Sequence, residues 1–102
     1  MPSKDYRIWL SDTAYLVVDL AMVRGRLVSF VVRLMVVCGD REYDIVRYDT
    51  AHGVPHRDSL GLKRGLLMKD WFFDQPLDVV LQTAIADLRA NYEKYYEQFK
   101  KH

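Results

Sequence analysis

The chain has 102 residues; half are hydrophobic, and 15 Lys and Arg stand against 14 Asp and Glu. This length predicts a single domain over residues 1–102 with a core that needs no disulfide. The near-zero net charge excludes a generally basic protein, so a nucleic-acid site must come from local clusters of cations. Charged residues interrupt the apolar runs, which argues against a signal peptide and a membrane span. We therefore expect a cytoplasmic protein without a membrane partner.

The first half of the chain alternates with a period near two and is rich in β-branched residues, which predicts strands. Short turns at Arg24–Arg26 and Gly39–Asp40 would join consecutive strands, so the sheet is expected to be an antiparallel meander. The expected strands are a short one, Tyr6–Asp12, and three long ones, Ala14–Val23, Leu27–Cys38 and Arg41–Thr50. A fourth core strand is expected in Leu66–Phe73, after a turn bracketed by Gly61 and Gly65.

Alternate residues of the two longest strands give the sheet one apolar face and one semi-polar face. The opposite, semi-polar face includes Asp19, Ser29 and Arg33. Cys38 ends an apolar run, and as the single cysteine it is expected to be a buried structural thiol. The apolar face is predicted to contain Leu16, Val18, Leu20, Met22, Val28, Phe30, Val32, Leu34 and Val36.

After Gln75 the period changes to about 3.6, which predicts one long helix up to the last residues. Asp74 is the expected N-cap, and Pro76 and Asp78 suit the first turn. The apolar stripe of this helix is expected to be Leu77, Leu81, Ala84, Leu88, Tyr92, Tyr95 and Phe99. The predicted class is therefore α+β: an antiparallel meander of three to five strands with a C-terminal helix packed on its apolar face.

The last turns of this helix are aromatic, and two interpretations are open. Tyr92, Tyr95, Tyr96 and Phe99 either overhang the sheet and meet a partner, such as a second copy, or close the edge of the core.

The stretch Tyr48–Asp58 is unusually polar for the end of a strand. Counted from the Gly39–Asp40 turn, Arg47 and Asp49 would face the apolar side of the sheet, which conflicts with their charge. Either they lie beyond the cover of the helix, or a β-bulge reverses the alternation near the strand end. A structural ion pair between Arg47 and Asp49 is a further interpretation.

Three chemistries are open for this stretch, whose Gly53 and Pro55 favour a loop. His52 and His56 suit acid–base cleavage of RNA. The same histidines with Asp49 or Asp58 would suit a metal. A purely structural loop is the third interpretation. For the RNA interpretation, the cations Arg47, Arg57, Lys63 and Arg64 would hold phosphate, and Tyr48 would stack on a base.

The order of elements and a short string of residues resemble the TumE-like toxins of prokaryotic toxin–antitoxin modules, and related small prokaryotic families. The string consists of Tyr48, Asp49, Ala51, His52 and His56. The resemblance implies a small toxin that acts on RNA and is neutralised by an antitoxin-like partner protein encoded alongside it.

The sequence thus leads to one hypothesis and one rival. The hypothesis is a toxin-like endoribonuclease that needs no metal or other cofactor. The rival is a non-catalytic, dimeric interaction module, and a homodimer is expected in both cases. Under the hypothesis the catalytic residues are His52, His56, Arg47 and Asp49, and the substrate-binding residues are Tyr48, Arg57, Lys63 and Arg64.

Overall fold

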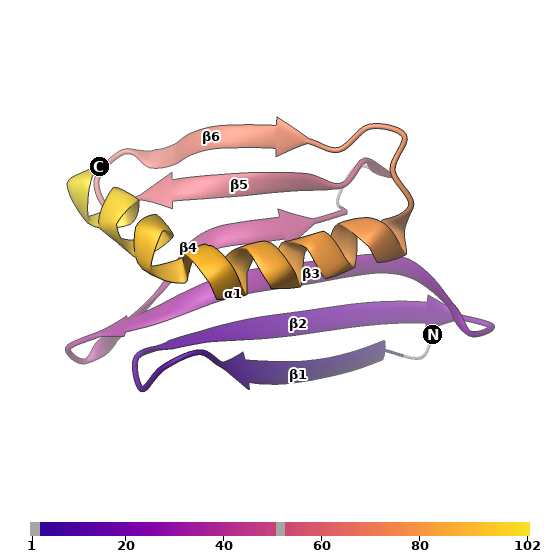
Figure 1. The fold of residues 1–102 in the computed structure, drawn as a ribbon, viewed down its shortest axis with the longest axis horizontal. Coiled ribbons are helices and arrows are strands. Elements are labelled where there is room, and N and C mark those ends of the chain that lie inside the picture. The colour runs from indigo at the N-terminus through magenta and orange to yellow at the C-terminus, as the bar shows by residue number, and fades with distance from the viewer. Residues whose placement is uncertain (1–2, 51–52) are drawn as a thin grey trace.

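A computed structural model describes residues 3–50 and 53–102, and within them it contains one antiparallel sheet and one helix (Figure 1). The strands lie in chain order in the sheet, so the topology is a simple meander. The elements are β1 (Ser3–Trp9), β2 (Ala14–Val23), β3 (Arg26–Cys38), β4 (Arg41–Asp49), β5 (His56–Gly61), β6 (Gly65–Trp71) and α1 (Leu77–Lys101). No helix in the described residues is long and apolar enough to cross a membrane.

The α+β class and the meander are confirmed, but the sheet has six strands instead of three to five. The unexpected strand is β5, whose residues were expected to form a loop. Its sequence, HRDSLG, lacks the alternation of apolar residues that marks a half-buried strand. Its partners on both sides supply the pairing: His56 lies opposite Asp49 of β4 and Trp71 of β6.

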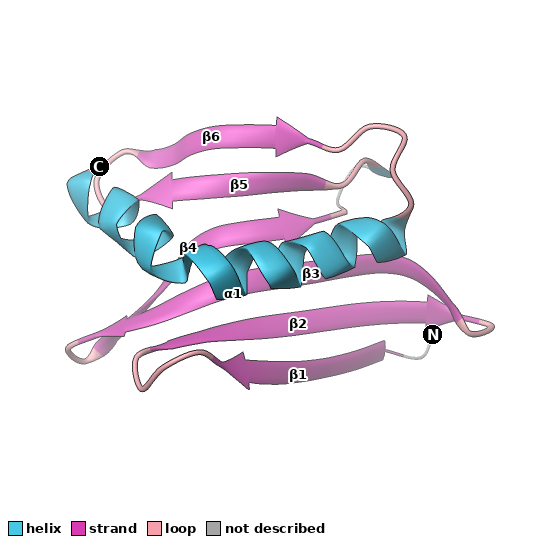
Figure 2. Cartoon of the chain, in the orientation of Figure 1, coloured by secondary structure: helices cyan, strands magenta, loops and turns pink. Residues whose placement is uncertain are grey.

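The helix covers one face of the sheet, and the hydrophobic core lies between the two layers (Figure 2). Its main contacts are with the four central strands, β2 to β5. The expected partners Leu16 and Leu34 lie opposite each other and are fully buried, as are Val18 and Val32. We call the other side of the sheet, which the helix does not cover, the open face.

The two hairpin turns differ in how well they match expectation. The Gly39–Asp40 turn is confirmed, with Cys38 opposite Arg41. The first turn contains only Arg24 and Gly25, both at positive φ, as a tight two-residue hairpin requires. One extra residue in β3, Val28, lies between the residues that pair with Ala21 and Met22, and it restores the expected pairing of β2 with the rest of β3. Val28 is 43% exposed, so it does not belong to the apolar face on which it was expected.

A second β-bulge sets the faces of β4. Val46 lies opposite Leu34 and Asp44 opposite Met35, so Ile45 is an extra residue between them. Beyond it the alternation is reversed: Val46 and Tyr48 enter the core, while Arg47 and Asp49 project from the open face. The bulge proposed from the sequence is therefore confirmed. Arg47 forms an ion pair with Asp44, at 2.6 Å, whereas a pair with Asp49 was one interpretation of the sequence.

The helix begins later than its capping pattern predicts. Pro76 is the N-cap and makes no side-chain cap bond, whereas Asp74 lies two residues earlier at φ 60°. The expected charges are confirmed, with Asp78 in the first turn and Lys100 and Lys101 in the last. The buried helix residues are Val80, Ala84, Leu88 and Phe99.

The aromatic end of the helix closes the core and does not overhang it. Phe99 is 5% exposed, and its ring centroid lies 5.4 Å from that of Tyr43 on β4. Tyr92, Tyr95 and Tyr96 also pack against the core.

Two further expectations about burial are wrong. The segment around β6 was expected to be a core strand, but β6 is an edge strand with Leu66 and Met68 about half exposed. Cys38 is exposed instead of buried, because β3 ends there and the Gly39–Asp40 turn projects from the sheet.

The last turn of the helix is held by the turn between β5 and β6. The backbone N–H of Leu62 donates to the Phe99 carbonyl, and those of Lys63 and Arg64 donate to the His102 carbonyl, at 2.7–3.0 Å. These bonds satisfy carbonyl groups that a helix end leaves without partners. Gly61 makes the approach possible, since a Cβ there would lie 2.8 Å from the carbonyl carbon of His102.

We predict that Gly61→Ala lowers the free energy of unfolding by about 1–3 kcal/mol, because the added methyl group pushes the helix end away from the turn. Urea denaturation measures this loss. Lys63→Ala is the control, because it changes an exposed side chain in the same turn and keeps the backbone bonds. Equal stability of Gly61→Ala and the wild type would show that the helix end is not held in this way.

Candidate functional site

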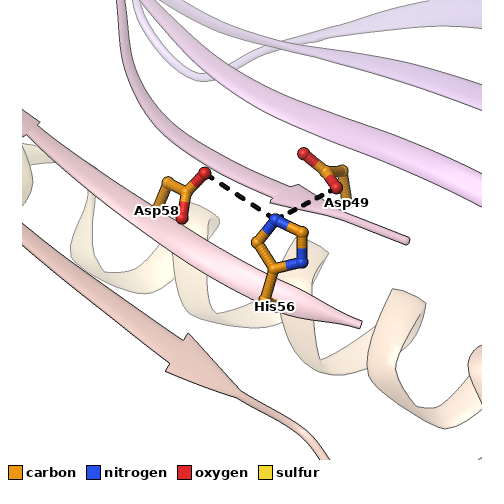
Figure 3. Close-up of side chains that lie close together, drawn as sticks. All are labelled: Asp49, His56 and Asp58. Carbon is orange, nitrogen blue, oxygen red and sulfur yellow. Dashed lines mark ion pairs between the residues drawn. The ribbon is translucent and has the colours of Figure 1, made fainter. Parts of the chain in front are cut away.

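A cluster of Asp49, His56 and Asp58 lies on the open face where β4 and β5 pair (Figure 3). Asp49 and His56 are direct cross-strand neighbours, and Asp58 follows His56 by two residues on the same face of β5. The His56 Nε2 lies 3.2 Å from Asp49 Oδ1 and 3.7 Å from Asp58 Oδ2. Strand pairing and the Ile45 bulge thus bring one imidazole and two carboxylates together.

The His56 ring is buried, with 2% of the residue exposed. Its Nδ1 lies 3.2 Å from the Val54 carbonyl oxygen, and because a carbonyl only accepts, we assign a proton to Nδ1. In a neutral imidazole the lone pair of Nε2 then faces the two carboxylates. This arrangement is stable if Nε2 carries a second proton or binds a cation.

Two residues of β6 complete the surroundings of the cluster. The Trp71 ring packs against the His56 ring with centroids 4.9 Å apart. Lys69 Nζ lies 3.1 Å from Asp58 Oδ1, within ion-pair distance but without the alignment of a hydrogen bond. Asp58 therefore uses one oxygen toward Lys69 and the other toward His56.

A pocket of about 430 Å³ lies beside the cluster on the open face. Asp49 belongs to its wall, together with Arg33 and Arg47. Both arginines reach toward Asp44, yet about two-fifths of each side chain stays exposed. A guanidinium has five N–H donors, so both keep donors for a ligand in the pocket.

The structure brings together only part of the predicted site. Arg47, Asp49 and His56 share the open face, as predicted for a common site. His56, however, begins a strand and is buried instead of lying in an open loop. His52 lies outside the described residues.

The four predicted substrate-binding residues lie elsewhere. Tyr48 and Arg57 pair across β4 and β5 on the helix-covered face, opposite the cluster. Lys63 and Arg64 lie in the turn after β5, at the far end of that strand from His56. None of them joins the cluster.

Tyr48 and Arg57 instead take part in a polar network that fastens the helix to the sheet. The hydroxyl groups of Tyr48 and Tyr95 each donate to Asp87 Oδ2 at 2.6 Å. Arg57 Nη1 donates to the Tyr95 hydroxyl at 2.9 Å, and Arg57 Nη2 pairs with Asp70 at 2.5 Å. The network joins residues of β4, β5, the helix and β6.

The network shifts the pKa values of its members in opposite directions. Burial raises the pKa of Tyr48 and Tyr95, and the hydrogen bond of each to Asp87 raises it further. Burial alone would raise the pKa of Asp87, but the hydrogen bonds from both tyrosines and Asn91, with the charge of Arg57, bring it below its ordinary value. Asp87 is therefore an ionised carboxylate with several donors.

Asp58 was predicted from the sequence only as one of two alternative metal ligands, and Trp71 and Asp87 were not predicted to belong to any site. The spacing of His56 and Asp58 was an available signal, since residues two apart on a strand share a face. Asp87 carried no such signal, because its partners are far away along the chain.

These features define a small α+β protein with a polar cluster on the uncovered face of its sheet. A family model for a domain of unknown function (DUF7718) matches residues 1–102, so the chain belongs to this family. No curated protein and no solved structure shows significant similarity to it.

We predict that Asp87→Asn destabilises the protein by about 1–3 kcal/mol at pH 7, because the donors around it lose an ionised acceptor. The folded-state pKa of Asp87 is lowered, so its contribution is present above the unfolded-state value of about 3.9 and is lost as the pH falls through the folded-state value. The difference in unfolding free energy between wild type and variant should therefore shrink below about pH 4.

Denaturant titrations at a series of pH values measure this difference. Glu93→Gln is the matched control, because Glu93 is an exposed acid on the same helix. A difference that stays constant down to pH 3 would contradict the role given to the Asp87 carboxylate.

Proposed function

We propose that the protein is an endoribonuclease that binds single-stranded RNA on the open face, with the Asp49–His56–Asp58 cluster as its reactive centre. The observation that carries the proposal is the set of residues next to this cluster. Two arginines line a pocket on one side of it, and exposed aromatic rings lie on the other side. Trp71 is 43% exposed and Phe73 64%, and their rings are stacked. Unpaired bases stack on such rings.

The pocket supplies the contacts that a phosphodiester needs. Arg33 and Arg47 line it with Asp49, so a phosphate bound by the guanidinium groups lies next to a carboxylate. Arg57, which the sequence predicts for this role, lies on the opposite face of the sheet, whereas Arg47 lies at the pocket.

In the proposed reaction Asp49 accepts the proton of a 2′-hydroxyl, whose oxygen then bonds to the neighbouring phosphorus. Arg47 and Arg33 stabilise the charge that develops on the phosphate oxygens. The bond to the 5′-oxygen breaks, and this leaving oxygen takes up a proton. The sequence offers His52, outside the described residues, as the donor. His56 is too buried to contact RNA and would act by orienting Asp49.

The resemblance to TumE-like toxins supports the biological part of the proposal, in which expression of the protein stops growth and an antitoxin-like protein relieves it.

We predict that the purified protein cleaves labelled single-stranded RNA, and that Asp49→Asn lowers the rate about 100-fold or more. Arg47→Gln is expected to lower it about 100-fold through lost charge stabilisation. Gel analysis of the products at matched protein concentrations measures both effects, and circular dichroism confirms that the variants fold.

Arg89→Gln is the control, because Arg89 is an exposed arginine of the helix, which covers the other face of the sheet. The proposal is wrong if the wild type leaves RNA intact, or if Asp49→Asn cleaves as fast as the wild type.

A second candidate is a non-catalytic module that forms a homodimer through β6, one of the two edge strands of the sheet. The edge of β6 offers unpaired backbone groups, and Leu66 and Met68 are 53% and 50% exposed along it. An exposed, apolar edge strand is a template for pairing with another chain. This surface takes the place of the aromatic helix end as the expected dimer contact, because those aromatic rings pack against the core.

For this candidate we predict a dimer that Met68→Lys weakens at least about tenfold in Kd, because a charge enters an apolar contact. Sedimentation over a range of concentrations measures it. Val79→Lys, at a similarly exposed apolar residue of the helix, is the control. A wild type that stays monomeric at about 100 μM, above the range of specific dimers, would exclude the homodimer.

A further inference from the structure

We propose that Asp49, His56 and Asp58 bind one divalent transition-metal ion, of the class of Zn²⁺ or Mn²⁺. The inference adds a ligand to the site of the proposed ribonuclease. The role of the ion in a reaction rests on that proposed function, but the binding of the ion does not.

The distances between the three side chains suit one metal ion. Their nearest ligand atoms all lie within 4.8 Å of one another, and the Nε2 to carboxylate distances are 3.2 and 3.7 Å. With metal–ligand bonds near 2.1 Å, neighbouring ligands lie about 3.0 Å apart in an octahedral site and about 3.4 Å in a tetrahedral one. The two distances from Nε2 to the carboxylate oxygens are close to these spacings.

His56 is oriented in the way that a metal-binding histidine is. We assign a proton to Nδ1, which lies 3.2 Å from the Val54 carbonyl oxygen, so Nε2 is the ring nitrogen that faces both carboxylates (Figure 3). A metal-binding histidine characteristically donates its other ring N–H to a carbonyl or a carboxylate, which fixes the ring for the metal. Burial of the ring to 2% exposure keeps it in this orientation.

The outer contacts of Asp58 also suit a metal ligand. Lys69 lies against Oδ1, while Oδ2 faces His56. A ligating carboxylate needs one oxygen for the metal, and its other oxygen is commonly held by a neighbouring donor. The cluster therefore has both the ligands of a metal site and the contacts that orient them.

The ligand set indicates the class of metal. One imidazole favours transition ions, and two carboxylates without a thiolate suit Mn²⁺, Fe²⁺ and Zn²⁺ better than Cu(I). Three protein ligands leave room for water or substrate on the ion, and Asp49 also lines the pocket with Arg33 and Arg47. A water bound to such an ion has a lowered pKa, so it would replace Asp49 as the proton acceptor in the proposed reaction.

Thermal unfolding and calorimetric titration test the site directly, using protein freed of metal by a chelator. Zn²⁺ or Mn²⁺ at about 100 times Kd should raise Tm by about 10 °C or more, and titration should give one ion per chain. Asp58→Asn should abolish the rise in Tm and weaken binding at least about 100-fold. Asp49→Asn serves as a second variant in case the first unfolds.

Asp19→Asn is the matched control, because Asp19 is a half-buried acid of the same face whose carboxylate lies outside the cluster. It should bind metal like the wild type. The inference is overturned if neither ion raises Tm, or if the Asp49 and Asp58 variants bind as tightly as the wild type does.

The RNA assay separates this inference from the proposed function. Metal binding without RNA cleavage keeps the site and excludes the ribonuclease. RNA cleavage that persists in a chelator, by a protein that binds no metal, keeps the ribonuclease and excludes the site.

Discussion

The extra residue in β4, Ile45, decides which side chains meet on each face of the sheet. Without it, Arg47 and Asp49 would continue the alternation of Tyr43 into the core. A single β-bulge reverses the phase of a strand, so every side chain after it changes face. Here the reversal places Val46 and Tyr48 under the helix and leaves Asp49 beside His56 on the open face. The core and the candidate site therefore depend on the same irregularity.

Because β5 pairs with the reversed part of β4, the polar residues of these two strands are divided between the two faces of the sheet. Successive residues of β5 point to opposite faces, so His56 and Asp58 join Asp49, while Arg57 joins Tyr48. On the covered face, Arg57 belongs to a network that supplies donors to the partly buried Asp87 carboxylate. The evident role of this network is to fasten the helix to the sheet. On the open face the polar groups lie at a pocket and beside exposed aromatic rings. A buried network with its partners in place stabilises structure, whereas polar groups at a pocket are available to a ligand.

Sequence patterns predicted the features that depend on local alternation. They located the Gly39–Asp40 hairpin, the buried row around Leu16 and Leu34, and the conflict at Arg47 and Asp49 that the bulge resolves. They failed where the structure depends on distant partners. The strand β5 has no apolar alternation of its own, and its pairing with β4 and β6 makes it a strand. For the same reason the pattern could not show that neighbours in sequence, His56 and Arg57, would serve opposite faces.

The capped end of the helix has a consequence for the order of folding. The turn after β5 binds the Phe99 and His102 carbonyl groups, so the middle of the chain is tied to residues made about 40 positions later. The strands β1 to β4 pair with their neighbours through short turns and can form early, as local contacts do. The turn of the β5–β6 hairpin gains its hydrogen bonds to the helix only when the last helical turn docks. We therefore expect this hairpin and the helix end to exchange their amide hydrogens as one cooperative unit, separately from the central strands.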